Sequence, residues 1–189
     1  HSTLTDLRLG KTLGDIGKFL FEKCSSIATV NIPGVESIGE KAFYDCTALS
    51  GLTLNSGTKS LGEQTFANCT ALKNVVLPPT VVSVSDGCFM NDHDLVTLDL
   101  GNSLEIIGPS AFSGCASLSE LNFPKTLYGL GVESFKGCEN LSYVTIPDGC
   151  RLSSIGARAF QNCTGIEWIS LSNRITSLGA NSFDGCNSI

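Results

Sequence analysis

A phenylalanine recurs along this chain at almost constant spacing, and this repeat limits the possible folds more than any other feature. The eight residues are Phe21, Phe43, Phe66, Phe89, Phe112, Phe135, Phe160 and Phe183, separated by 22, 23, 23, 23, 23, 25 and 23 residues. A fixed period of this size is typical of solenoids, in which each repeat forms one coil of a stack.

Other positions keep the same register. A cysteine stands three residues after each phenylalanine except in one repeat, which has Asp92. A glycine stands four residues before each phenylalanine except in the same repeat, which has Ser85. Leu or Ile follows at six residues, and two further apolar residues follow at nine and eleven. The repeat is therefore a single structural unit of about 23 residues.

The pattern of one unit predicts its local structure. Leu-x-x-Leu-x-Leu ends in a period of two, which indicates a short strand with one buried face. Prolines such as Pro33 and Pro78 end that strand. The Ile/Leu-Gly pair predicts a second extended stretch, and Ala-Phe-x-x-Cys predicts one helical or 3₁₀ turn. One coil cannot bury its own apolar side chains, so neighbouring coils must stack with parallel strands.

The whole chain, residues 1–189, is predicted to form one domain of about eight coils of 22–25 residues. Leu4, Leu7 and Leu9 match the tail of an earlier repeat, and Ile189 matches the start of a strand. We therefore expect both ends to lie inside a longer array. The two extra residues of the irregular coil, around 148–151, predict a bulged loop.

Residues 107–124, Ile-Gly-Pro-Ser-Ala-Phe-Ser-Gly-Cys-Ala-Ser-Leu-Ser-Glu-Leu-Asn-Phe-Pro, carry a family resemblance. This motif resembles the BspA-like, or Treponema-type, leucine-rich-repeat family, and the resemblance covers essentially the whole chain. It implies an α/β, β-rich solenoid: a right-handed arc with a parallel sheet on the concave face and short strands with 3₁₀ or helical turns on the convex side. Many members are bacterial or protist cell-surface proteins linked to adhesion.

Composition argues against two classes of partner. The formal net charge is −6, and the 12 Lys and Arg residues are too scattered for the basic stripe that nucleic acid requires. No apolar run approaches the roughly 18 residues that span a bilayer. We expect no nucleic acid partner and no direct membrane insertion.

Seven of the nine cysteines share one repeat position and should form a column with neighbours about 5 Å apart. That distance also allows disulfides, but a small buried thiol suits such a column, so free thiols are favoured over disulfides or a metal site. Cys88 and Cys150 lie outside the column. Cys150, in the bulged loop, is predicted to be the most reactive thiol.

The sequence predicts no enzyme, no cofactor and no metal. Residues 91–94, Asn-Asp-His-Asp, could be drawn as a metal site around His93, but such a polar run is more often a solvated turn. No nucleophile elbow, phosphate loop or H-E-x-x-H motif occurs.

The outward positions of the strands, eight and ten residues after each phenylalanine, are mostly small and polar. Tyr143 and Trp168 are exceptions one coil apart, and exposed aromatic residues are frequent binding anchors. Alternatively, the two rings only cover each other at an end that further repeats would bury. The predicted partner-binding surface on the concave face comprises Asp99, Glu120, Asn122, Tyr143, Thr145, Trp168 and Ser170.

The function predicted from these features is a non-catalytic module, expected to be monomeric, that binds a protein or glycan as part of a cell-surface or secreted adhesion-type protein. One alternative is a cytoplasmic scaffold, because a ladder of free thiols suits a reducing compartment. Another is the substrate-presenting repeat region of a larger enzyme.

Overall fold

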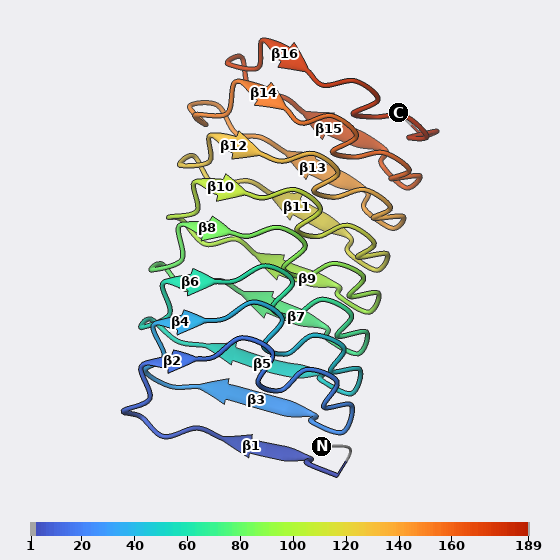
Figure 1. The fold of residues 1–189 in the computed structure, drawn as a ribbon. Coiled ribbons are helices and arrows are strands. Elements are labelled where there is room, and N and C mark those ends of the chain that lie inside the picture. The colour runs from blue at the N-terminus through green and yellow to red at the C-terminus, as the bar shows by residue number, and fades with distance from the viewer. Residues whose placement is uncertain (1–2, 189) are drawn as a thin grey trace.

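The computed structural model describes residues 3–188 and shows a stack of about eight coils, each contributing two strands (Figure 1). The chain climbs from the N-terminal coil to the C-terminal coil without folding back, so each coil touches only the coils before and after it. Ile189 lies outside the described residues. The predicted solenoid is confirmed, whereas the hand of the arc and its concave side stay predictions.

The odd-numbered strands form one side of the stack, which we call the broad sheet. Its members are β1 (Asp6–Arg8), β3 (Thr29–Ile32), β5 (Gly51–Leu54), β7 (Asn74–Val76), β9 (Thr97–Asp99), β11 (Glu120–Asn122), β13 (Tyr143–Thr145) and β15 (Trp168–Ser170).

The even-numbered strands form a second side, which we call the narrow sheet. Its members are β2 (Asp15–Ile16), β4 (Ser37–Ile38), β6 (Ser60–Leu61), β8 (Ser83–Val84), β10 (Ile106–Ile107), β12 (Gly129–Leu130), β14 (Ser154–Ile155) and β16 (Ser177–Leu178).

All the paired strands are parallel, and residues one repeat apart lie opposite each other. In the broad sheet Val30 pairs with Leu52, and in the narrow sheet Ile38 pairs with Leu61. This register places identical repeat positions in columns, so a residue's outward or inward direction is the same in every coil.

The phenylalanine column forms the centre of the core. Successive rings from Phe21 to Phe183 are stacked with centroids 5.1–5.7 Å apart, and the six rings from Phe43 to Phe160 are fully buried. Phe123 adds an edge-on contact to Phe135 at 5.8 Å. Because each ring packs between those of neighbouring coils, the core exists only when the coils are stacked.

The Ala-Phe-x-x-Cys segment forms consecutive tight turns, and residues 3–188 contain no helix, so the helical-turn prediction was wrong. The residues two before and two after the phenylalanine have positive φ in all eight coils, as at Lys41 (52°) and Asp45 (62°). A helix requires continuous right-handed residues, so this alternation prevents one. Backbone N–H groups instead bond to the next coil, as from Phe43 to the Thr65 carbonyl at 2.9 Å.

The narrow sheet is interrupted between β6 and β8 and between β12 and β14. Ser85, which follows β8, replaces the repeat's glycine. A Cβ at the matching Gly62 would lie 2.5 Å from the Glu40 backbone nitrogen, so a side chain at this position requires the neighbouring backbone to shift. The Ser85 hydroxyl donates instead to the Leu61 carbonyl at 2.6 Å. The second break coincides with the two-residue insertion of the irregular coil.

None of the nine cysteines forms a disulfide. In six coils the thiol donates to the carbonyl of the preceding coil's phenylalanine, at 3.1–3.4 Å. The prediction for Cys150 was wrong. Cys150 is fully buried, and its thiol donates to the Pro124 and Leu127 carbonyls. It occupies the same core column as Leu127 one coil earlier, because the two extra residues come after Cys150 in the chain.

Asp92 occupies the cysteine position of its coil and is fully buried, so the prediction of a solvated turn was wrong for this residue. Its Oδ1 accepts the Cys69 backbone N–H at 2.8 Å, whereas Oδ2 has no partner among the described residues. Burial raises the pKa of Asp92 well above its usual range, and the Cys69 bond opposes this rise. His93 and Asp94, by contrast, are exposed.

Replacing Phe112 with alanine should lower the free energy of unfolding by about 3–5 kcal/mol, because it removes a fully buried ring from a stacked column. Urea denaturation measures the loss. Phe19→Ala is the matched control, since that ring is 46% exposed, and it should cost less than about 1 kcal/mol. Equal losses in the two variants would contradict a core centred on the column.

Thiol titration should find nine reactive groups in denaturant without reductant. In the native protein only Cys186 should react promptly, because it is the one partly exposed cysteine. Even there burial raises the pKa to about 11, which keeps the thiolate fraction small at neutral pH. Prompt labelling of Cys150, detected by peptide mass, would contradict this assignment.

Asp92→Cys should raise the free energy of unfolding at pH 7 by about 1–3 kcal/mol, because a thiol can donate to the Phe66 carbonyl as in neighbouring coils. The raised pKa of Asp92 means that the folded protein loses stability as pH rises from about 3.9 through the folded pKa. The advantage of the variant should therefore shrink toward pH 4, as measured by thermal melts. Asp94→Cys, at an exposed position, is the control. An advantage independent of pH would show that the carboxyl's ionisation is not the cause.

Candidate binding surface

Burial alternates along the strands of the broad sheet, as the period of two predicts. In β11, Leu121 is buried in the core, while Glu120 and Asn122 on either side of it are exposed. In β11, β13 and β15 the outward residues of successive strands lie side by side in two columns.

The aromatic exception lies where the sequence predicts it. Tyr143 pairs with Trp168 in the parallel register, and their side chains are 49% and 52% exposed. The ring contacts among the described residues all join phenylalanines, so these two rings do not stack on each other. Each ring therefore keeps area available to a partner.

The structure places most of the other predicted residues beside this pair. Glu120 lies opposite Tyr143, and the second column runs Asn122, Thr145, Ser170. Asp99 belongs to β9, which is adjacent to β11 but not bonded to it in the described ladder. Its carboxylate also accepts the Gly101 N–H at 2.8 Å, which ties it to the following turn.

A hollow of about 310 Å³ lies at the break between β9 and β11, lined by Val96, Thr97, Leu98, Ser119, Glu120 and Asn122. Sequence reasoning missed it because a repeat predicts regular pairing at every step. One side of Glu120 therefore faces this hollow, and the other side faces Tyr143 of β13.

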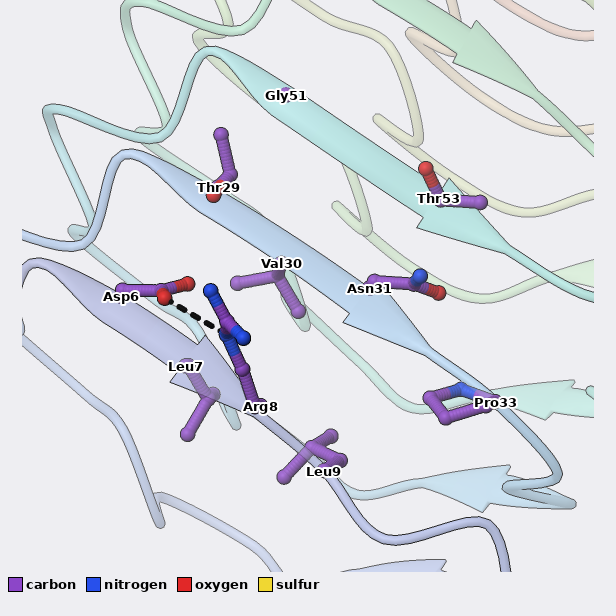
Figure 2. A pocket seen from close by; sticks show the side chains of 10 residues that line it. All are labelled: Asp6, Leu7, Arg8, Leu9, Thr29, Val30, Asn31, Pro33, Gly51 and Thr53. Carbon is purple, nitrogen blue, oxygen red and sulfur yellow. Dashed lines mark hydrogen bonds and ion pairs between the residues drawn. The ribbon is translucent and has the colours of Figure 1, made fainter.

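A larger hollow of about 470 Å³ lies at the N-terminal end of the broad sheet (Figure 2). Asp6 and Arg8 form an exposed ion pair there at 3.0 Å, and the polar side chains of Thr29, Asn31 and Thr53 point outward from β3 and β5. Gly51 lies opposite Thr29 and has no side chain, which deepens the surface. This hollow could have been predicted from the sequence, because Gly51 is a glycine at an outward position of its strand.

The described residues contain no group of three potential metal ligands and no helix that could cross a membrane. His93 faces the Gly114 carbonyl, with its Nδ1 2.9 Å from the oxygen.

The repeat and the stack agree with comparisons to known proteins. A family profile described as "BspA type Leucine rich repeat region" matches six copies over residues 1–118 and 83–189. The chain belongs to the BspA-type leucine-rich-repeat family. A comparison with curated proteins found no match.

Solved structures of similar leucine-rich-repeat proteins come from bacteria. A Treponema pallidum leucine-rich-repeat protein is 24% identical, with a TM-score of 0.68 over 97% of this chain and 77% of that one. A leucine-rich cell-surface protein of Faecalibacterium prausnitzii is 26% identical, with a TM-score of 0.72 over 98% and 65%. The pneumococcal vaccine antigen PcpA is 17% identical, with a TM-score of 0.56 over 92% and 57%.

These likenesses support the fold of this BspA-type chain, which spans less than two thirds of two of the three solved chains. A shared scaffold does not define a shared partner, because function depends on the side chains displayed.

Proposed function

We propose that this chain is a non-catalytic binding module whose broad sheet holds a protein or glycan partner over β11, β13 and β15. The observation that carries the proposal is the pair of half-exposed rings, Tyr143 and Trp168, held side by side by the parallel register. Aromatic residues of this kind contribute much of the binding energy in many interfaces.

The stack supports this role by holding the rings in place. The residues beneath them, Val144 and Ile169, pack into the core, so neither strand can move independently of its neighbours. Binding to such a surface orders few additional groups and therefore has a small entropy cost. The polar residues Asn122, Thr145 and Ser170 beside the rings supply hydrogen-bonding groups at the rim.

We place the module in a surface or secreted protein, in keeping with the Faecalibacterium cell-surface protein that shares its fold. The second candidate is an intracellular scaffold. It is favoured by the nine cysteines without a disulfide, eight of them buried, because thiols persist readily in a reducing compartment.

The parent protein is first tested for binding to a panel of purified extracellular proteins and immobilised glycans. For any ligand found there, the double variant Tyr143→Ala, Trp168→Ala should bind with at least about tenfold lower affinity, because two aromatic anchors are removed. Its melting temperature should stay close to that of the parent. The matched control is Tyr128→Ala, which removes a ring 43% exposed on the other side of the stack and should leave binding unchanged.

Unchanged binding by the double variant would exclude the aromatic pair as the site. A large fall in melting temperature would show instead that the rings stabilise the fold.

A further inference from the structure

The surface around the aromatic pair is acidic and lacks counter-charges. Glu120 precedes Tyr143 by one coil, and the exposed Glu167 directly precedes Trp168. Strands β9, β11, β13 and β15 contain no Lys or Arg. Neither glutamate has an ion-pair partner among the described residues, whereas Glu36 and Glu133 elsewhere hold a cation at 2.9 and 2.8 Å.

Elsewhere in the chain a glutamate and a tyrosine in successive coils are joined by a cation. On the other side of the stack Glu105 and Tyr128 lie in successive coils, joined by a backbone bond of 2.9 Å. Arg151 lies over the Tyr128 ring, 5.0 Å from its centroid, with a guanidinium nitrogen 3.7 Å from the Glu105 carboxylate. The irregular coil, with its two extra residues, supplies this arginine.

Glu120 and Tyr143 repeat that acid–aromatic pair on the broad sheet. Both pairs consist of a glutamate and a tyrosine 23 residues apart, at equivalent positions of successive coils. On the broad sheet Trp168, opposite Tyr143, occupies the third place of the column, and no cation of the described chain pairs with Glu120. The hollow of about 310 Å³ beside Glu120 instead leaves room for a side chain from outside.

We propose that this site binds a Lys or Arg side chain from an exposed basic segment of a protein partner. The proposal rests on the proposed function and names the partner's chemistry. The cationic head enters the hollow and pairs with Glu120, while Tyr143, Trp168 and Glu167, on the other side of Glu120, contact the adjoining part of the segment. A segment that contains arginine fits best, because guanidinium groups pair with carboxylates and stack on aromatic rings.

Charge distinguishes this partner from a neutral glycan. A sugar could stack on the rings, but it would desolvate Glu120 and Glu167 without supplying a positive charge. A basic segment neutralises both carboxylates, and its approach is favoured by a chain of net charge −6.

The test uses the emission of Trp168, which is the only tryptophan of the chain and lies within the site. The parent protein is titrated with the peptide (Gly-Arg)4, with (Gly-Glu)4 and with maltohexaose. We expect (Gly-Arg)4 to change the emission saturably and with an affinity that falls as salt is added, and the other two probes to leave it unchanged.

Glu120→Gln should weaken (Gly-Arg)4 binding about fivefold, which corresponds to the loss of one favourable charge pair. Glu63→Gln, an exposed acid outside the site, is the matched control for net charge and should bind like the parent. Circular dichroism melts show whether both variants stay folded.

Three results would overturn the proposal: no change of emission with (Gly-Arg)4, equal weakening by both variants, or a saturable response to maltohexaose that Glu120→Gln leaves unaltered. Under the third result, a partner would still bind at the aromatic pair, so the proposed function would stand. The proposed function fails separately, through unchanged binding of the double variant on the panel.

Discussion

The structure depends on burial shared between coils. No coil has an interior of its own, so each phenylalanine ring from Phe43 to Phe160 is covered by the rings above and below it. The backbone obeys the same constraint, since the N–H groups of the turn segment bond to carbonyls of the next coil. Stability and shape therefore come from contacts between residues about 23 positions apart.

Stacking leaves one side of each strand outside the core, and this is where the protein can differ from coil to coil. Inward positions must suit their column, which is why their residue types recur. Outward positions are free of that demand, so an aromatic pair or an acid can be placed there without disturbing the fold. Tyr143 and Trp168 are such placements.

Departures from the repeat change the stack locally. Ser85 places a side chain where the other coils have glycine, and the narrow sheet is interrupted beside it. Asp92 places a carboxyl where neighbouring coils have a thiol, at a cost in desolvation. The irregular coil brings Arg151 onto Tyr128 and Glu105, whereas Trp168 takes the equivalent position after Glu120 and Tyr143 on the broad sheet.

The period of the sequence was enough to predict the parallel stack, the buried columns and the adjacency of Glu120, Tyr143 and Trp168, because an inward or outward direction repeats with the coil. Only the tertiary structure decided the turn conformation, the burial of Cys150 and Asp92, and the hollow beside Glu120. The turn conformation depends on positive φ angles, the burial of Cys150 on where the insertion lies, and the hollow on which neighbouring strands are hydrogen-bonded. These properties arise from contacts between coils, so they cannot be predicted from the spacing of residues along one coil.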